Sequence, residues 1–577
     1  MSVFELTAVL ILLGVACSLL LMGLGFLMME FLQLEPSPLE AFVIGWGVLI
    51  GTLELYHLFR PVELAVSLAV VAAGLVGLTR KLFRLREFGT ELRSINVAAA
   101  AFSLLLIFVI ALRSTGPCVH YDTGLYGVSA VQWLTSFRVV PGIANLYGRL
   151  GFNSSFFLCI AALQSIGLGP LSYRLWEGAL LALTAVLVVV SIAGICRGSQ
   201  IRPSAWFNVI LIVPLVSYIG YSQLVGVDTD LPSTLCCFLG VFLLLREWEN
   251  REGTVAARQA TLIAACVVFA MAIVTKLSTA AFAGPCCLLS LWKLSSVHAA
   301  PQASRRARAG CFFLLAEIFA LWVCAGYVES GYPLYPNDLL GLPFSWKVPD
   351  ASVRMLAGII KSWARVAFVS RHKTEGWRWL TVWLLYARED RIHFWAPLVT
   401  IGVAVVLLVL VSNKSGYSLR DLWPVLLFGL LSAVVWFFMA PDLRFVQGPI
   451  WALAGIIGGI SLTSLNARIR PQFALLVVLV ILFFSVFFAY PRVLWQQLNA
   501  PMQIQYPEAL FPSVPVGTFQ TRSGLLVQVP MASDQCWDAP LPCTPYFNPN
   551  LQLRRPPSLQ SGFRSADFVE YQWMPFP

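Results

Sequence analysis

Long apolar segments alternate with short polar segments along most of the chain. Many of the apolar segments approach or exceed the roughly 18–20 residues that a helix needs to cross a bilayer. They lie near residues 3–28, 39–56, 62–79, 95–113, 172–195, 204–224, 231–245, 260–275, 278–293, 311–328, 395–412, 421–439, 446–464 and 472–490. The pattern predicts an all-α polytopic membrane protein with about 13–14 transmembrane helices. A β-barrel would show short alternating segments instead.

Composition supports the membrane class and argues against nucleic acid as a partner. The chain is 58% hydrophobic and 12% charged, whereas soluble proteins carry about 25% charged residues. The net charge of +10 comes largely from short loops between apolar segments, as the positive-inside bias predicts. The first apolar segment lacks a basic start and a small-residue cleavage site, so we interpret it as a retained span and not a signal peptide.

Loop charges predict which loops share a side of the membrane. Six loops are rich in Lys and Arg and are therefore expected inside: 80–94, 196–203, 246–259, 302–310, 413–420 and 466–471. Helix parity then places the N-terminus outside, together with 114–151, 225–230, the break at 276, 329–394, 440–445 and the tail after 490. The loop 329–394 is also basic, but loops beyond about 60 residues largely escape the rule.

Two segments need separate treatment. Residues 152–169 are apolar, yet the loop assignments leave room for only one crossing between 114–151 and 196–203. This segment should re-enter the membrane or lie along its interface; the alternative is that it spans and a later assignment is wrong. Residues 351–372 form an amphipathic pattern that predicts an interfacial helix. Its apolar face has Val353, Leu356, Ile360, Trp363 and Ala367, and its basic face has Arg354, Lys361 and Arg365. The basic face is expected either to lie on anionic lipid alone or also to meet a lipid phosphate.

The chain divides into a membrane domain, residues 1–490, and a polar, proline-rich tail, residues 491–577. Of the thirteen cysteines, most lie in apolar segments, where cysteine behaves as a small hydrophobe. Cys536 and Cys543 lie in the tail, and their close spacing suggests a disulfide in an oxidising compartment. The run "GLLVQVPM" in the tail is typical of a strand, so we expect a small external cap.

Ionisable residues near the ends of the apolar segments gather on the predicted external side. Charged groups near membrane depth are costly and are candidates for function. The charges of other loops, and not these residues, assigned each loop to the external side. That all these residues fall on the same side is therefore independent evidence that they belong together. The residues are Asp122 in "CVHYDTGLYG", Asp228 and Asp230 in "VGVDTDLPS", Lys276 in "AIVTKLST", and Asp442 and Arg444 in "FMAPDLRFVQG".

Each of these residues also has a purely structural interpretation. Asp230 precedes "LPSTLCCFLG" and fits a helix N-cap, which makes Asp228 the less easily explained acid. Lys276 could extend to the interface, and Asp442 could pair with Arg444 alone. Asp122 could begin a turn. Their convergence on one side argues against a structural explanation for all of them.

The segment after Asp122 adds candidate binding groups. Arg presents a planar donor fork suited to phosphate or sugar hydroxyls, while aromatic rings either stack on sugars or anchor the chain at the interface. These side chains are Tyr121, Trp133, Arg138, Asn145, Tyr147, Arg149 and Asn153. His120 and Tyr121 flank the acid and could shape its surroundings. Gly124 and Gly127 could let the backbone turn close to a substrate.

The layout resembles the GT-C superfamily of integral-membrane glycosyltransferases that use polyprenyl-phosphate-linked sugars. That group includes protein mannosyltransferases and the aminoarabinose transferases of lipid A. The resemblance covers roughly residues 95–345, including "SGYPLYP" at 330–336, which resembles uncharacterised bacterial relatives. It matches Asp122 to the catalytic acid of the first large external loop, Asp228 and Asp230 to a second acidic motif, and Lys276 to a lysine after Thr. Three apolar segments precede 95–113, and "FNSSFF" replaces an "HPP"-type segment, so this chain departs from the pattern.

The resemblance implies sugar transfer from a polyprenyl-phosphate carrier to a glycan, lipid or protein acceptor. Asp122 would be the general base, and Lys276, Arg149 and Arg444 would stabilise the leaving phosphate. Asp228 could position the acceptor or bind a divalent cation, the one possible cofactor. The remaining expected binding residues are His120, Tyr121, Asn153, Asp230 and Asp442. A bacterial inner membrane with a periplasmic active face fits the short loops and the predicted disulfide.

Two other functions remain open at this point. A transporter or flippase would place ionisable residues near mid-membrane on broken helices and often shows an internal repeat. We find no convincing repeat. A non-catalytic assembly subunit would not bring the acids together.

Overall fold

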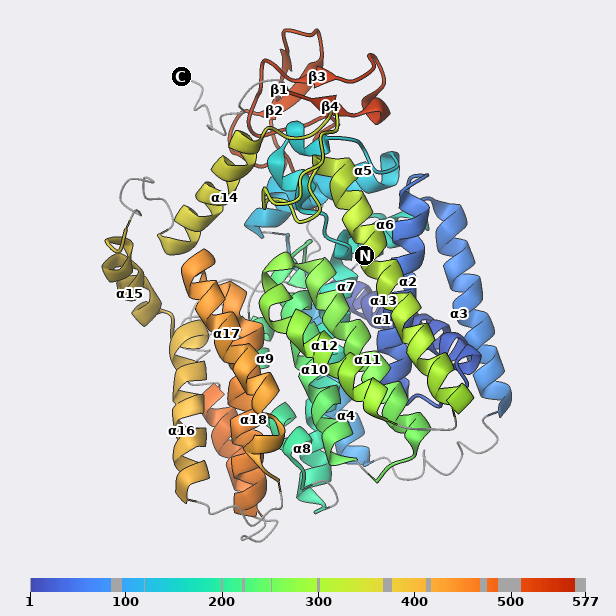
Figure 1. Ribbon diagram of the computed structural model, residues 1–577, viewed down its shortest axis with the longest axis vertical. Helices are drawn as coiled ribbons and strands as arrows, with labels where there is room; N and C mark the ends of the chain where they lie inside the picture. The colour runs from blue at the N-terminus through green and yellow to red at the C-terminus, as the bar shows by residue number, and fades with distance from the viewer. Residues whose placement is uncertain are drawn as a thin grey trace.

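The structure is a computed structural model that describes residues 2–84, 96–118, 120–198, 201–220, 224–250, 252–297, 301–366, 376–410, 417–466, 475–485 and 510–565. Helices form an upright bundle, and a small cap with short strands sits on one end of it (Figure 1). The all-α polytopic fold class predicted from the apolar segments is therefore confirmed.

Ten helical segments of the described residues are long and apolar enough to cross a membrane. Their α-helices are α1 (Val3–Phe31), α2 (Pro38–His57), α3 (Leu64–Arg84), α7 (Ser172–Cys196), α10 (Asp230–Glu249), α11 (Val255–Thr275), α12 (Ala280–Ser296), α13 (Pro301–Ser330), α16 (Ala396–Leu410) and α18 (Gln447–Asn466). Shorter apolar helices join them: α4 (Val97–Arg113), α8 (Pro203–Ile210) followed by α9 (Ile212–Gly220), α17 (Trp423–Met439) and a helix at Leu475–Ser485. The described residues thus contain ten candidate spans, fewer than the 13–14 expected from the apolar segments.

The segment 152–169, which was expected to re-enter the membrane or lie along its interface, contains the short helix α6 (Phe156–Ser165). Its 10 residues extend about 15 Å, half of the roughly 30 Å hydrocarbon core, so α6 is too short to cross. The start of the segment is tied to the end of α11, because the Ser155 N–H donates to Val274 O at 3.0 Å. The segment therefore stays at one end of the bundle, beside α5 (Val128–Ser136) and below the cap (Figure 1).

The loops that were predicted to lie outside meet at the cap end of the bundle. Backbone hydrogen bonds join the segment 114–151 to the ends of α2 and α13. The Val139 N–H donates to His57 O at 3.1 Å, the Val62 N–H donates to Leu134 O at 2.9 Å, and the Gly142 N–H donates to Val328 O at 2.8 Å. These segments therefore lie at one end of the bundle, as the count of helices between the basic loops predicted. The opposing basic loops 80–94, 413–420 and 466–471 lie largely outside the described residues.

The long loop 329–394 contains the predicted amphipathic helix and a second helix that sequence patterns missed. The predicted helix is α14 (Asp350–Arg365), on which Val353 and Leu356 are buried and Arg354 is exposed. Trp363 was expected on the apolar face but is 40% exposed, and Ala367 lies outside the described residues. The missed helix is α15 (Trp379–Glu389), which buries two of its tryptophans against the end of α17.

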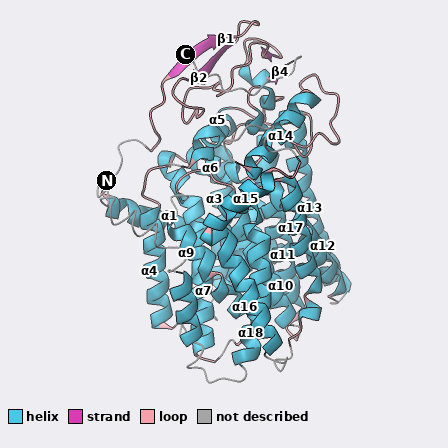
Figure 2. Ribbon diagram, turned by 90° about the vertical axis from the view of Figure 1, so that its left-hand side faces the viewer, coloured by secondary structure: helices cyan, strands magenta, loops and turns pink. Residues whose placement is uncertain are grey.

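The cap is a small two-hairpin structure formed by residues 510–565. Strand β1 (Val516–Gln520) pairs antiparallel with β2 (Leu526–Pro530) (Figure 2). Strand β3 (Gln552–Leu553) pairs antiparallel with β4 (Phe563–Arg564). The strand expected from "GLLVQVPM" is thus β2. The structure also contains the disulfide Cys536–Cys543 in this cap.

Candidate functional site

Residues 121–127 of the stretch "CVHYDTGLYG" form helical turns that lead directly into α5. Residues 123–127 form one π-helical turn (η3, Thr123–Gly127), a rare conformation that is frequent at functional sites. Two buried hydrogen bonds fix this turn to the loop before α10. The Val227 N–H donates to Thr123 Oγ1 at 2.9 Å, and the Cys118 thiol donates to Val225 O at 3.1 Å. Asp122 is therefore held beside the second acidic motif, although more than a hundred residues separate the two.

Asp122 faces Arg149, which lies on the 3₁₀ turn η5 (Gly148–Phe152). The nearest Arg149 nitrogen is 3.8 Å from Asp122 Oδ1, and each side chain is 24% exposed. Burial alone would lower the pKa of the Arg149 guanidinium, but the Tyr147 phenol and the Asp122 carboxylate outweigh it and raise that pKa. Arg149 is therefore a permanent cation next to Asp122.

Asp228 takes the capping role that we expected of Asp230. Its carboxylate accepts the Asp230 N–H at 3.0 Å and the Leu231 N–H at 3.4 Å, at the start of α10. The carboxylate is buried and lies 3.9 Å from His120 Nε2. The Asp228 N–H in turn donates to the buried Glu177 at 2.8 Å. Asp228 thus organises the helix start, which leaves Asp230 free for other partners.

Asp230 is the centre of an ion-pair cluster that joins three elements. It pairs with Lys276, the residue that follows α11, and lies 3.7 Å from Arg444 on η12 (Leu443–Val446). Arg444 also pairs with Asp442 at 3.0 Å, so the expected Asp442–Arg444 pair is present but is part of a larger cluster. The Lys276 ammonium lies 4.2 Å from the centre of the Phe445 ring, a favourable cation–π distance.

The two groups of charges lie near each other. Asp122 lies close enough to Arg444 to interact with it electrostatically. The carboxylates of Asp122, Asp228 and Asp230 all interact electrostatically with the buried Tyr126 phenol. The acids of the site are far apart in the sequence, but all lie at the cap end of the bundle. Among the described residues, no group of three or more His, Cys, Asp and Glu side chains is arranged to hold a metal ion.

Asp122 differs from the other three aspartates of the site. Asp228, Asp230 and Asp442 each accept hydrogen bonds from backbone or side-chain donors. Within the described part of the chain, no donor hydrogen-bonds to the Asp122 carboxylate, and its 3.8 Å contact with Arg149 exceeds hydrogen-bond distance. Asp122 therefore keeps its lone pairs available for a hydroxyl group of another molecule.

The cap covers this loop, a feature that the sequence patterns did not reveal. The Tyr121 hydroxyl donates to Asp534, and the Gln535 amide donates to Tyr121 O at 2.8 Å. Burial and the hydrogen bond to Asp534 raise the pKa of the Tyr121 phenol, so it stays protonated as the donor. The ring of Tyr546 lies 5.8 Å from that of Tyr147, next to Arg149. The cap residues are too far away in sequence for any local signal to link them to Asp122.

Gly124 is the contact point between the loop and the cap. The Trp537 N–H donates to Gly124 O at 2.9 Å, and a Cβ added at Gly124 would overlap the Trp537 indole. We suggested above that this glycine admits a substrate, but in the structure it admits Trp537. Asn153, another expected binding residue, uses its side-chain amide to donate to Trp322 O on α13 at 2.6 Å.

We expect Gly124→Ala to loosen the cap. The new methyl group must displace Trp537, and such overpacking costs about 1–3 kcal/mol. Hydrogen–deuterium exchange should therefore rise in residues 510–565 and stay unchanged in α10 and α11. Gly284→Ala in α12 is the matched control, because a Cβ there meets nothing within 4 Å. Equal exchange in the cap of both variants would contradict the role assigned to Gly124.

Residues 8–451 match a protein family described as "Domain of unknown function (DUF8201)". The chain belongs to this family. The DUF8201 region contains Asp122, Arg149, Lys276, Arg444 and the acids near α10, whereas the described cap residues, 510–565, lie beyond it. No curated protein and no solved structure matches the chain.

Proposed function

We propose that this DUF8201 protein is a membrane glycosyltransferase that moves a sugar from a polyprenyl-phosphate carrier to an acceptor hydroxyl. The observation that carries the proposal is the contrast among the four aspartates: three accept hydrogen bonds, and Asp122 alone accepts none among the described residues. An unengaged carboxylate beside fixed cations suits a general base next to a departing phosphate.

The reaction is a direct displacement at the anomeric carbon of the sugar. The acceptor hydroxyl attacks that carbon, Asp122 takes the hydroxyl proton, and the bond between the sugar and the phosphate breaks. The bonding electrons stay on the polyprenyl phosphate, which leaves as an anion. One base without a nucleophilic second carboxylate favours inversion of configuration.

The cations divide into two roles. Arg149 lies 3.8 Å from Asp122, where it would orient the base. Lys276 and Arg444 are held together by Asp230, which offsets their mutual repulsion, and a phosphate would bind at their side of the cluster. Lys276 is 18% and Arg444 33% exposed at the side chain, so both remain accessible to a ligand.

We place the cap face outside the cytoplasmic membrane of a bacterium. The loops on the opposite face are the ones with the basic residues that favour the cytoplasm. A disulfide persists in an oxidising compartment such as the periplasm. The donor is therefore a lipid-linked sugar, since nucleotide sugars are cytoplasmic metabolites.

The proposal is tested by profiling lipids in a strain that lacks this protein. We expect a polyprenyl-phosphate-linked sugar to accumulate and one envelope glycan or glycolipid to lose that sugar, because the donor is made but not used. Mass spectrometry of extracted lipids and of envelope glycans measures both. Complementation with the intact chain should reverse both changes. An unaltered lipid-linked sugar pool together with unaltered glycans would refute the proposal.

A further inference from the structure

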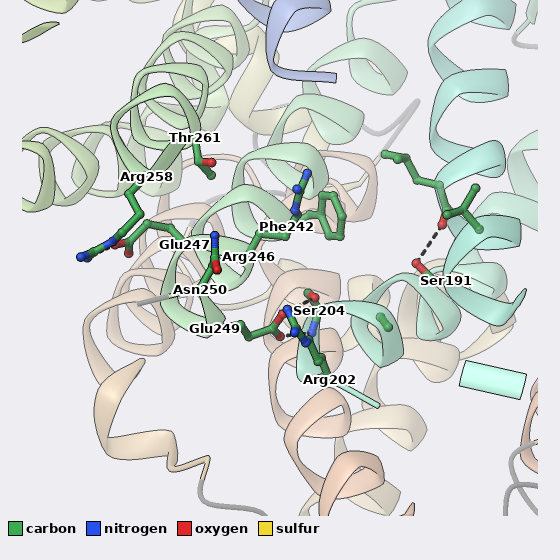
Figure 3. Close-up of a pocket in the computed structure, with 13 residues that line it drawn as sticks. Ser191, Arg202, Ser204, Phe242, Arg246, Glu247, Glu249, Asn250, Arg258 and Thr261 are labelled. Atoms are coloured by element: carbon green, nitrogen blue, oxygen red, sulfur yellow. Dashed lines mark hydrogen bonds and ion pairs between the residues drawn. The ribbon is translucent and has the colours of Figure 1, made fainter. Parts of the chain in front are cut away.

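A polar cavity lies at the end of the bundle opposite the cap. It has a volume of about 470 Å³ and lies between α7, α8, α10 and α11 (Figure 3). Helix α10 runs from Asp230 in the Asp122 site to Glu249 in this cavity, a length of about 30 Å at 1.5 Å per residue. The cavity is therefore separate from the proposed transferase site and needs its own explanation.

The cavity carries an excess of positive charge. Arg202, Arg246 and Arg258 line it together with Glu247 and Glu249. The Glu247 charge is already balanced twice, by Arg258 at 2.6 Å and by Lys293 at 3.1 Å. Three arginines thus line the cavity with two carboxylates, one of which Lys293 also balances, and this excess of positive charge favours an anionic ligand.

Two of the arginines are available to that ligand. Within the described part of the chain, neither Arg202 nor Arg246 forms an ion pair; the Arg246 guanidinium lies 5.8 Å from the centre of the Phe242 ring. The Glu249 carboxylate accepts both the N–H and the hydroxyl of Ser204 at 2.5 Å, and it attracts Arg202 and Arg246 without an ion pair to either within 4 Å. Both arginine side chains therefore keep donors that suit the oxygens of a phosphate group.

One wall of the cavity is apolar and continues onto the outside of the bundle. Leu187 and Val190 of α7 and Phe242 of α10 form this wall. Val190 is 49% exposed on a helix that is long and apolar enough to span the membrane. A soluble anion would gain nothing from such a wall, whereas the acyl chain of a lipid would lie along it.

We propose that this cavity binds the headgroup of an anionic phospholipid, with the phosphate on Arg202 and Arg246 and an acyl chain along α7. The site is independent of the proposed sugar transfer. Basic cavities between spans on the cytoplasmic side are suited to anionic lipid headgroups, because the charge lies at headgroup depth. The shared chemistry is a phosphate anion, which could also come from solution, so the experiment must separate the two sources.

The test is a titration of the delipidated full-length protein in detergent with phosphatidylglycerol, followed by native mass spectrometry. Arg246→Gln should weaken binding by about tenfold, since a charge-assisted hydrogen bond is worth about 1.5–3 kcal/mol. Arg246→Lys keeps the charge and should retain most of the binding. Arg305→Gln is the matched control, because Arg305 is exposed near the start of α13, at the same end of the bundle but outside the cavity.

Each result bears directly on the proposal. Selective loss in Arg246→Gln, with phosphatidylcholine binding weakly and millimolar inorganic phosphate failing to compete, supports a lipid site. Unchanged binding by Arg246→Gln, or an equal loss in Arg305→Gln, overturns it. Competition by inorganic phosphate assigns the cavity to a soluble anion and overturns the lipid assignment. If Arg246→Gln does not fold, weak binding by a folded Arg246→Lys variant also overturns the proposal.

Discussion

We expect Asp122→Asn to lower the rate of sugar transfer by about 10²–10⁴-fold, the usual contribution of a general base. Asn has nearly the same shape as Asp but cannot accept the proton of the acceptor hydroxyl. Asp122 makes no hydrogen bond among the described residues, so the change should leave the fold intact. The measurement is the initial rate of transfer from a radiolabelled polyprenyl-phosphate sugar in membrane vesicles that contain equal amounts of each variant.

Asp338→Asn is the matched control for this substitution. Asp338 lies in the loop 329–394 at the cap end and pairs with Arg354 at 3.2 Å, on exposed side chains outside the charge cluster. The control removes the same charge and should transfer sugar at the normal rate. Undiminished transfer by Asp122→Asn, or an equal loss in the control, would remove Asp122 from the mechanism.

The second large effect is expected from Asp230→Asn, on stability. Removing one partner of a buried ion pair typically costs about 3–5 kcal/mol, because it leaves the other charge uncompensated. Asp230 is 9% exposed, and Arg444 still has Asp442, so Lys276 is the charge that loses its carboxylate. We therefore expect a loss of about 3 kcal/mol, measured as a lower midpoint of thermal unfolding in detergent.

A double variant separates this charge effect from simple damage to the helix start. Asp230→Asn combined with Lys276→Met removes both charges and should regain most of the lost stability. Lys276→Met alone should cost less than Asp230→Asn, since Asp230 keeps Arg444 at 3.7 Å. A double variant as unstable as Asp230→Asn would show that the pairing with Lys276 does not carry the stability of this site.

Much of the fold follows from local sequence patterns because the membrane imposes strong constraints. Apolar length identified the spans, and loop charge with helix parity placed Asp122, Asp230, Lys276 and Arg444 at one end. The helix α14 followed from its amphipathic period. The helix α15 did not, because its tryptophans bury against α17 and leave apolar side chains such as Tyr386 exposed, so no clear polar face is visible.

The details of the charge cluster depend on contacts that no local pattern contains. Asp228 and Asp230 are both reasonable N-caps, and the choice depends on which side chain can reach the free N–H groups of α10. The Lys276 partner could not be identified without knowing that α11 ends beside the start of α10. Gly124 shows the same limit. Its missing side chain makes room for Trp537, which is distant in the sequence, so no local pattern links the two residues.

The contact between Tyr121 and Asp534 has a consequence for biosynthesis. These two residues are 413 positions apart, so every described span after α4 is synthesised between them. The ribosome must complete the whole bundle before the cap can dock on the loop of Asp122. A translation product that stops after α18 would therefore insert in the membrane with its acids assembled but not covered by the cap. The cap docks on the site only after the whole bundle has been synthesised.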